Sequence, residues 1–384
     1  MKLAIIWSRF GAYHLARLRG AASVGLGRGA GIVGVEIARQ DHYKWEVREG
    51  ADGFERITLF PDAAYDELRV SRIRKAVKRL LDEIRPDVVA VNGWSVAEAR
   101  AAIAWCGKRP KAKAILMSET KQDEGEKRAW WKELIKRWLV GQCDAALVGG
   151  RPHAAYLRHL GFPPERIFLG YDVVDNEYFA RESVAARVKD GENRRRYNLP
   201  ERYFFACTRF LPRKNIAGLL HAYAAYRSRT TSPWGLVIAG DGEELEALQV
   251  LESSLGLDDV HWPGFLRYRE LPVYFGLARA FIHPALSEPW GLVVNEAAAC
   301  GLPLLVSETV GARYELVEDG ANGILFDPKS RDAMAGAMLR VSGMSDAERA
   351  AMGRRSCGIV SEWGPERFGQ GVFDAMDVAI GRDA

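Results

Sequence analysis

Short apolar runs of strand length alternate with stretches of helical spacing from the start of the chain. Residues 3–7 form an apolar run, a glycine-containing loop follows, and Leu15, Leu18 and Ala22 then recur at helical spacing. Further strands are predicted at residues 32–37, 57–60, 88–91, 114–117 and 145–148, with helices at about 66–84, 96–105 and 126–140. This alternation predicts a parallel, doubly wound sheet, although the first loop lacks the G-x-G-x-x-G pattern.

The alternation begins again in the second half of the chain. Strands are predicted there at residues 203–208, 236–239, 260–262, 281–283, 304–306 and 324–326. Because 384 residues are too many for one compact core, the two series predict two domains. The predicted fold class is therefore α/β, with two Rossmann-like sheets. The charged stretch 181–196 is predicted to be a solvated linker.

One unit of strand, loop, helix and strand, residues 281–307, carries the most specific chemistry. Pro289 fits the first turn of its helix, which is predicted to end near Gly301. Because glycine has no side chain, a ligand can approach the backbone at Gly291. The free amides at the start of this helix, together with the positive end of the helix dipole, predict an anion site. These amides are those of Gly291, Leu292 and Val293.

Two glutamates flank the predicted anion site, Glu288 in the loop and Glu296 about two turns into the helix. A diphosphate at the helix start would be repelled by carboxylates, whereas carboxylates accept hydrogen bonds from hydroxyl groups. A sugar on one side and a ribose on the other satisfy both conditions, so the pattern predicts a nucleotide sugar as the ligand. Two solvated glutamates at the start of a surface helix are the alternative.

The two glutamates, separated by seven residues in Ser-Glu-Pro-Trp-Gly-Leu-Val-Val-Asn-Glu-Ala, resemble the E-x7-E motif of the retaining GT-B glycosyltransferases of family 4, glycosyl transferases group 1. The resemblance implies that Glu288 holds hydroxyls of the donor sugar and that Glu296 holds the ribose. It is strong over residues 206–339 and holds only in outline for the first half. It implies a GT-B fold, in which two Rossmann-like domains face an interdomain cleft.

The same resemblance implies how the chain is divided. Residues 365–380 resemble the C-terminal helix of the family, which crosses back onto the first domain. The predicted domains are therefore residues 1–180 with about 365–384, which would bind the acceptor, and residues 197–364, which would bind the donor.

Residues 208–215 resemble the R-x4-K-N motif of the family, which implies that Arg209 and Lys214 hold the donor diphosphate. Fixed cations stabilise the negative charge that a leaving nucleoside diphosphate gathers. A surface loop with several cations is the alternative. The resemblance also implies donor contacts at Gly240 and Asp241, in a G-D-G turn, and at Leu266.

In the first domain, candidate ligand contacts follow the strand ends, where ligands of such sheets bind. The resemblance places the first loop at the cleft, and Gly11 is a candidate donor contact there. The candidate acceptor contacts are Tyr13, His14, Asn92, Trp94 and Glu119. His14 is either a general base or a plain hydrogen-bonding residue. Many relatives have a histidine near the position of Glu119, so Glu119 takes over that sugar contact, faces the acceptor or is only a turn residue.

Basic residues concentrate in the first half of the chain. Residues 1–180 contain 30 Lys and Arg against 23 Asp and Glu, and the rest contains 24 against 27, within a net charge of +4. Around residues 130–138, three tryptophans mix with basic residues, namely Trp130, Trp131 and Trp138 with Lys127, Arg128, Lys132, Lys136 and Arg137. This stretch predicts either a helix on an anionic membrane, helped by the basic run 72–79, or a docked helix with its tryptophans in the core. Nucleic acid is a poorer partner because no known binding module accompanies the charges.

Other patterns predict a cytoplasmic protein, peripheral to the inner face of the membrane if the aromatic helix binds lipid. The chain has no apolar run of membrane-spanning length, and Arg9 comes too soon for a signal peptide. Its five cysteines are scattered and never in C-x-x-C spacing, as expected of a reduced chain. The seven histidines show no metal-ligand cluster and no D-x-D motif lies near the donor motif, so no metal is expected.

The resemblance implies retaining transfer of a hexose from a UDP- or GDP-sugar to a glycan, lipid-linked or small-molecule acceptor, without a cofactor. Two alternatives remain. A GT-B sugar-nucleotide epimerase shares the architecture but needs acid and base carboxylates around the sugar. A non-catalytic scaffold would keep the fold, and it is disfavoured because the four charged donor residues occur together. These are Arg209, Lys214, Glu288 and Glu296.

Overall fold

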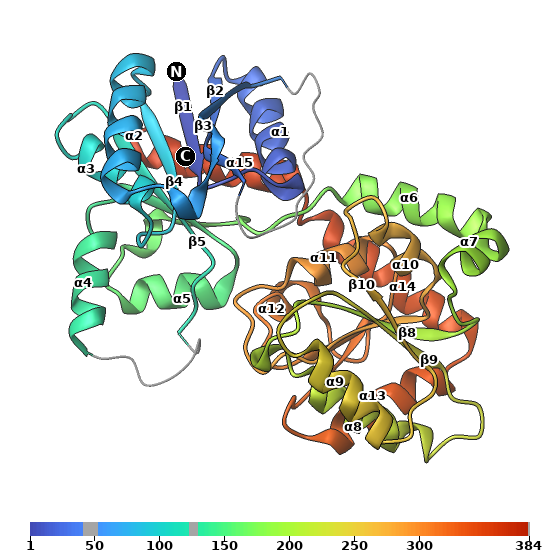
Figure 1. Ribbon diagram of the computed structural model, residues 1–384. Coiled ribbons are helices and arrows are strands. Elements are labelled where there is room, and N and C mark those ends of the chain that lie inside the picture. Colours follow the sequence, from blue (N-terminus) through green and yellow to red (C-terminus); the bar gives the residue numbers. More distant parts are fainter. Residues whose placement is uncertain (41–52, 123–129, 383–384) are drawn as a thin grey trace. The chain divides into compact units, whose positions relative to one another are not determined.

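The computed structural model describes residues 1–40, 53–122 and 130–382, which form two compact units (Figure 1). Unit 1 consists of Met1–Val174 and Trp363–Ala384, and unit 2 consists of Asp175–Glu362. The C-terminal segment therefore belongs with the first unit. The division falls at residue 174 rather than at residue 180.

The charged stretch 181–196 is not the linker that the sequence predicts. It lies in two helices of unit 2, α6 (Asn176–Val188) and α7 (Asp190–Tyr197). Two of its arginines donate to backbone carbonyls near α10 (Leu271–Leu277): Arg187 to Gly276 O at 3.3 Å, and Arg194 to Leu277 O at 3.1 Å. These bonds hold α6 and α7 against the rest of unit 2. The pattern of apolar residues in the sequence does not reveal such bonds.

Unit 1 is built on a parallel sheet of seven strands in the order β3-β2-β1-β4-β5-β6-β7. The strands are β1 (Lys2–Trp7), β2 (Gly31–Gln40), β3 (Glu55–Ala64), β4 (Val88–Asn92), β5 (Lys113–Ser118), β6 (Ala145–Val148) and β7 (Ile167–Leu169). The six predicted strands are confirmed, and β7 is an additional edge strand. This order is that of a Rossmann-like sheet, so the prediction of a doubly wound unit is confirmed.

Helices cover both faces of this sheet. One face carries α1 (Ala12–Gly27) and α15 (Pro365–Ala379), which pack closely: a Cβ atom on Gly20 would lie 1.9 Å from Pro365 O. The other face carries the remaining helices of the unit around a second core. These are α2 (Val70–Ile84), α3 (Ala97–Cys106), α4 (Trp130–Val140) and α5 (Arg151–His159), with the short 3-10 helices η1 (Tyr65–Glu67) and η2 (Pro164–Arg166) in the connections.

Unit 2 repeats the architecture with six parallel strands in the order β10-β9-β8-β11-β12-β13. The strands are β8 (Tyr203–Cys207), β9 (Gly235–Ala239), β10 (Val260–Gly264), β11 (Ala280–His283), β12 (Leu304–Ser307) and β13 (Gly323–Phe326). All six predicted strands of this half are confirmed. The direction of strand order reverses between β8 and β11, and ligands of such sheets bind at that point, beyond the carboxyl ends of the strands.

The helices of unit 2 surround this sheet (Figure 1). Besides α6, α7 and α10, they are η3 (Pro212–Lys214), α8 (Ile216–Arg227), α9 (Leu245–Ser254), α11 (Leu292–Ala299), α12 (Arg313–Leu316), α13 (Arg331–Gly343) and α14 (Asp346–Ser361). The strands other than the partly buried edge strand β10 are almost fully buried, with Phe204, Ile282 and Leu305 in one continuous core. The loops at the carboxyl edge of the sheet are therefore held by a rigid scaffold.

In the described part of the chain, none of the helices has the length and apolar character needed to cross a membrane. All five cysteines lie in that part, and each is a free thiol.

Candidate functional site

Two loops meet at the point in unit 2 where the strand order reverses. One follows β8 and contains η3, and the other follows β11 and leads into α11. The Leu286 amide donates to Arg213 O at 2.8 Å, which ties the second loop to the first. Asn215 Nδ2 donates to Pro284 O at 3.1 Å and to Pro328 O at 2.8 Å. The residues of the R-x4-K-N motif and the first glutamate of the E-x7-E motif are therefore held side by side.

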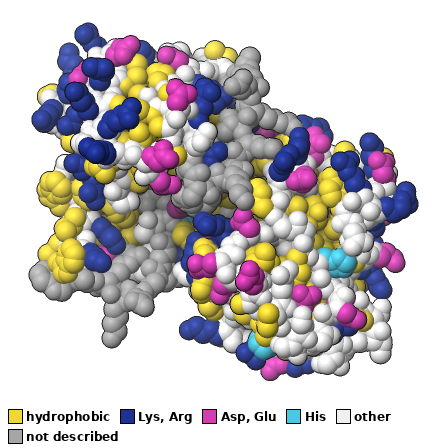
Figure 2. All heavy atoms as spheres, in the orientation of Figure 1, with side chains coloured by type: hydrophobic (Ala, Val, Ile, Leu, Met, Phe, Trp, Pro, Cys, Tyr) yellow, Lys and Arg dark blue, Asp and Glu magenta, His cyan; other side chains and the backbone are white. Residues whose placement is uncertain are grey.

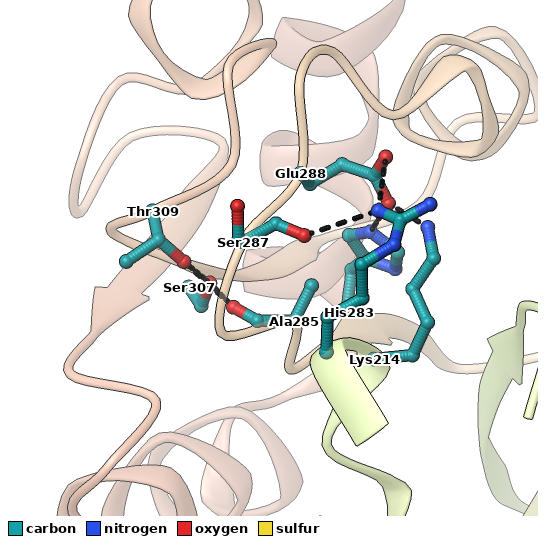
Figure 3. Close-up of polar contacts among 8 residues, drawn as sticks. Lys214, His283, Ala285, Ser287, Glu288, Ser307 and Thr309 are labelled. Atoms are coloured by element: carbon teal, nitrogen blue, oxygen red, sulfur yellow. Dashed lines mark hydrogen bonds and ion pairs between the residues drawn. The ribbon is translucent and has the colours of Figure 1, made fainter. Parts of the chain in front are cut away.

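Lys214, Glu288 and His283 form a buried cluster between these loops (Figure 3). The Lys214 ammonium and His283 Nε2 both contact Glu288 Oε2, the imidazole nitrogen at 3.2 Å. The side chain of Arg213 reaches the other carboxylate oxygen, with NH1 3.6 Å from Oε1. Glu288 is only 7% exposed, Lys214 9% and His283 1%. Two cations and an imidazole thus surround one buried carboxylate.

The charge state of this cluster follows from its contacts. Burial alone would raise the pKa of Glu288, but the hydrogen bond from His283 and the Lys214 ammonium outweigh burial and lower the pKa to about 2. Burial lowers the pKa of His283, against the opposing effect of Glu288, so the imidazole is neutral. An ionised carboxylate can only accept, so the proton of the neutral ring lies on Nε2. His283 Nδ1 is then an acceptor, and it has no hydrogen-bond partner among the described residues.

The loop that carries Glu288 is fixed by the loop that comes after β12. Ser307 Oγ and Thr309 Oγ1 each donate to Ala285 O at 2.6 Å (Figure 3). The Gly311 amide donates to Glu288 O at 3.1 Å, and a Cβ atom on Gly311 would lie 1.7 Å from Pro289 O. The backbone around Glu288 is therefore clamped from two sides, which holds its carboxylate in one place.

The helix after Glu288 begins later than the sequence predicts. Pro289 is not in its first turn, because α11 starts at Leu292 with Gly291 as its N-cap. Gly291 has φ +97°, and a Cβ atom there would lie 3.3 Å from Glu288 Cγ. This left-handed conformation is strained for residues other than glycine, so it ends the loop and delays the helix. Gly291, Leu292 and Val293, the predicted anion-binding residues, are all partly exposed.

The other predicted donor residues lie at the same edge of the sheet. Arg209 is exposed in the loop after β8. Gly240 and Asp241, after β9, pack on that loop: the Phe210 amide donates to Asp241 O at 2.7 Å, and a Cβ atom on Gly240 would lie 1.8 Å from Thr208 O. The Gly240 amide in turn donates to Gly264 O at 2.9 Å, two residues before the buried Leu266. Glu296, on α11, is 1% exposed.

In unit 1, two helices begin with the same arrangement of glycine and histidine. His14 Nδ1 accepts the Gly11 amide at 3.0 Å at the start of α1, and His153 Nδ1 accepts the Gly150 amide at 3.0 Å at the start of α5. Burial, followed by the nearby arginines, lowers the pKa of His14 well below its ordinary value. His14 is therefore a neutral helix-capping residue. That finding favours a hydrogen-bonding role over a general base. Tyr13 follows Gly11 by two residues in α1 and is partly buried.

The remaining acceptor candidates differ in their surroundings. Asn92 ends β4 and donates through Nδ2 to Ser8 Oγ at 3.3 Å, at the reversal point of this sheet. Trp94 is 8% exposed and belongs to the core, which favours a packing role over the predicted acceptor contact. Glu119 is exposed after β5 and hydrogen-bonds to the buried Asp172.

Asp172 is held by a cation as well as by Glu119. Arg17 NH2 lies 3.1 Å from Asp172 Oδ1, and its guanidinium lies 4.3 Å from the centroid of the Tyr171 ring. Burial and then the Glu119 carboxyl raise the pKa of Asp172 well above its ordinary value, against the opposing effect of Arg17. The two carboxyl groups therefore share a proton, with Glu119 at the exposed end of the pair.

Two residues of the unit 2 cluster have no predicted role, namely His283 and Arg213. His283 is the last residue of β11, and the rule that ligands bind at the carboxyl ends of parallel strands points to that position. Arg213 lies within the R-x4-K-N motif, but its contact with Glu288 depends on the fold. Strand-end position was therefore the available signal for His283.

The fold and this site define a class of protein. Two Rossmann-like parallel sheets are the architecture of the GT-B glycosyltransferases. Residues 190–356, most of unit 2, match the model of the family described as Glycosyl transferases group 1. The family match is therefore confined to unit 2, where the sequence resemblance was also strongest, and the prediction of the GT-B fold is confirmed.

Individual relatives sharpen the comparison. The chain is 34% identical over 131 residues to the O-antigen chain mannosyltransferase B of Escherichia coli, covering 34% of each chain. It is 34% identical over 188 residues to the GDP-mannose-dependent alpha-(1-6)-phosphatidylinositol monomannoside mannosyltransferase of Mycolicibacterium smegmatis, covering 46% of this chain and 47% of that one. The matches thus span a third to a half of these relatives. The structure of a sucrose-phosphate synthase from Thermosynechococcus elongatus is similar in fold, with a TM-score of 0.74, 18% identity and 97% of both chains covered.

Proposed function

We propose that the protein is a retaining glycosyltransferase that moves a hexose from a nucleotide diphosphate sugar to an acceptor hydroxyl without a metal ion. The observation that carries the proposal is the cluster of Lys214, Glu288 and His283 at the reversal point of the unit 2 sheet. It combines an ionised carboxylate, which suits sugar hydroxyls, with cations that suit a diphosphate.

The proposed donor contacts divide by charge. Glu288 accepts hydrogen bonds from hydroxyls of the hexose, and its low pKa means that it is ionised at neutral pH before the donor binds. Lys214 and Arg209 bind the diphosphate, helped by the amides at the start of α11. Glu296, farther along α11, accepts from the ribose. Lys214 contacts Glu288, so donor binding exchanges this ion pair for contacts of each partner with the donor.

The proposed chemistry needs charge stabilisation more than a nucleophile. As the glycosidic bond breaks, negative charge gathers on the departing nucleoside diphosphate, and Lys214 and Arg209 stabilise it. Retention follows if the acceptor hydroxyl attacks the face that the diphosphate leaves, with a phosphate oxygen taking the proton. The fixed cations and amides carry the role that a metal ion has in other transferases. Activity that survives a chelator would support this point.

The names of the relatives suggest where to begin with substrates. Two of them are mannosyltransferases, and one is named as dependent on GDP-mannose, so a GDP-hexose is the first donor to test and a UDP-hexose the second. Their names also describe acceptors in an O-antigen chain and in a phosphatidylinositol monomannoside. A glycan or lipid-linked acceptor is therefore proposed ahead of a soluble small molecule.

The sugar-nucleotide epimerase is the second candidate, and the charge state of Glu288 weighs against it. An epimerase needs a carboxyl group that gives up and takes back a proton near neutral pH. With a pKa of about 2, Glu288 has no proton to give near neutral pH and is a weak base. Incubation of the protein with the donor alone, followed by analysis of the sugar nucleotide, distinguishes the two activities.

The test begins with a thermal-shift screen of GDP-mannose, GDP, UDP-glucose and UDP, followed by product analysis with glycan acceptors. The expected result is that either the guanosine or the uridine compounds stabilise the protein, and that the corresponding nucleoside diphosphate is released during transfer. Glu288→Ala should abolish transfer while the nucleotide diphosphate still stabilises the protein, and Glu192→Ala, on the exposed side of α7, is the matched control. If no sugar nucleotide binds, or if Glu288→Ala leaves turnover unchanged, the proposal is wrong.

A further inference from the structure

Helix α4 of unit 1 turns its apolar side outward. Trp131, Leu134, Ile135 and Trp138 recur at the spacing of one helix face, and their exposed fractions are 50%, 52%, 49% and 66%. Figure 2 shows hydrophobic side chains gathered where α4 lies at the edge of unit 1 in Figure 1. We call these four side chains the α4 apolar face. Lys127 and Arg128 lie outside the described residues, as does the side chain of Trp130, and none of them is counted in this face.

The inward side of α4 is polar instead. Lys136 Nζ donates to Glu133 Oε1 at 2.8 Å and to Tyr156 OH at 2.9 Å, and the Tyr156 hydroxyl lies 3.0 Å from Glu133 Oε2. Leu139 and Val140, at the end of the helix, pack against the core. A surface helix of a soluble protein normally buries its apolar stripe and exposes its charges. In α4 this arrangement is reversed, so burial within unit 1 does not account for the apolar face.

The composition of the α4 apolar face fits a bilayer surface. Tryptophans stand at both ends of the face, and tryptophan favours the boundary between lipid headgroups and acyl chains. The exposed cations Lys132 and Arg137 lie on either side of the stripe. An apolar stripe edged by basic residues is typical of helices that lie in the plane of an anionic membrane.

A second helix adds charge on the same side of unit 1. Helix α2 covers the same face of the sheet as α4. It has five cations, all exposed, against the two acids Asp82 and Glu83 at its end. The cations are Arg72, Arg74, Lys75, Lys78 and Arg79. Asp82 is moreover paired with Arg109. This face therefore combines exposed apolar side chains with an excess of positive charge, which complements anionic headgroups.

We propose that unit 1 docks on an anionic membrane through the α4 apolar face, with α2 supplying electrostatic attraction. A protein partner or a second copy of this chain would cover the apolar side chains equally well, but neither explains why the cations collect on the same face of the unit. The docking residues belong to unit 1 and the proposed donor residues to unit 2. The inference therefore stands or fails independently of the transferase activity.

The test is flotation of the full chain with vesicles of phosphatidylcholine alone and of phosphatidylcholine mixed with phosphatidylglycerol. Binding is expected to the anionic vesicles only, and to weaken as salt is raised. Trp131→Ser with Trp138→Ser should reduce the partition coefficient about tenfold or more, because both side chains are already exposed and their loss removes lipid contact. Lys75→Glu with Lys78→Glu should have an effect of similar size at low salt.

Controls separate docking from misfolding and from self-association. Leu26→Ser removes an apolar side chain that is 85% exposed on α1, which covers the opposite face of the sheet, and should leave binding unchanged. Each variant should keep the thermal stability of the wild type. The proposal is overturned if the wild type ignores anionic vesicles, or if the tryptophan variant binds as well as the wild type. It is also overturned if light scattering shows a dimer that the tryptophan substitutions dissociate.

Discussion

Replacement of Glu288 by glutamine tests the electrostatics of the site without any substrate. The carboxylate contacts Lys214 and His283, and its pKa is lowered from 4.5 to about 2. A group whose pKa is lower in the folded protein stabilises it at pH values above the unfolded pKa and loses that effect as the pH falls through the folded pKa. At about 1.4 kcal/mol for each pH unit of difference, the contribution at neutral pH is roughly 3 kcal/mol.

The pH dependence gives this prediction its specificity. Glu288→Gln should lower the free energy of unfolding by about 3 kcal/mol at pH 7, and by only about 1 kcal/mol at pH 3, where the carboxyl group of the unfolded chain is already protonated and that of the folded protein is still mostly ionised. Urea denaturation of both proteins at a series of pH values between these limits measures the difference. The exposed Glu192→Gln substitution on α7 is the control and should change the free energy little at any pH.

Two results would refute the electrostatic argument. A difference between wild type and Glu288→Gln that stays constant from pH 7 to pH 3 would mean that the loss comes from packing rather than from charge. A difference near zero at pH 7 would mean that the contacts with Lys214 and His283 only offset the cost of burying the carboxylate.

Other predictions rest on single contacts. Lys214→Ala should lower kcat/KM for transfer about 30- to 1,000-fold, or roughly 2–4 kcal/mol, with the exposed Lys329→Ala as control in steady-state kinetics. Gly291→Ala should destabilise the protein by about 1–2 kcal/mol in urea because of its positive φ and close neighbours, whereas Gly336→Ala, in an open position of α13, should be neutral or stabilising. Because the pKa of Asp172 is raised, its ionisation costs stability as the pH rises, so Asp172→Asn should gain stability relative to the wild type with rising pH, and a constant difference would contradict the shared proton.

The sheets were predictable because each strand is an apolar run bounded by turn residues. Strand β7 escaped because its three residues are only partly buried at the edge of the sheet. Helices α6 and α7 were not predicted because their sequence is highly charged and lacks a clear apolar pattern. Arg187 and Arg194 stabilise them through contacts with backbone carbonyls that depend on the fold. The start of α11 was displaced because proline at an N-terminal position is a general preference, whereas the left-handed backbone at Gly291 depends on the loop around it.

The candidate donor site was predictable as a set of residue types but not as an arrangement. The motif spacing places Lys214 and Glu288 in loops after two strands, and the strand order then brings these loops together. The contact of His283 with Glu288 depends on that meeting, so the sequence offered only the position of His283 at the end of a predicted strand. For α4, the sequence left open whether its tryptophans are buried or face a membrane. The exposure of Trp131 and Trp138 excludes burial in the core of unit 1.

The histidine caps of unit 1 bear on where a phosphate group can settle. At the start of both α1 and α5, the first amide is already bonded to an imidazole of its own helix. A neutral imidazole accepts the hydrogen bond of this amide without adding any charge. These two helix starts therefore have one amide fewer for binding an anion than a helix start without such a cap. At the start of α11 the N-cap is again a glycine, Gly291, but the residue in the position of these histidines is Val294, whose apolar side chain cannot accept a hydrogen bond from the Gly291 amide. Helices α1 and α5 therefore begin with an amide that a histidine already caps, whereas α11 begins without a side-chain cap. Of these three helix starts, that of α11 is the one best suited to an anion such as a phosphate group.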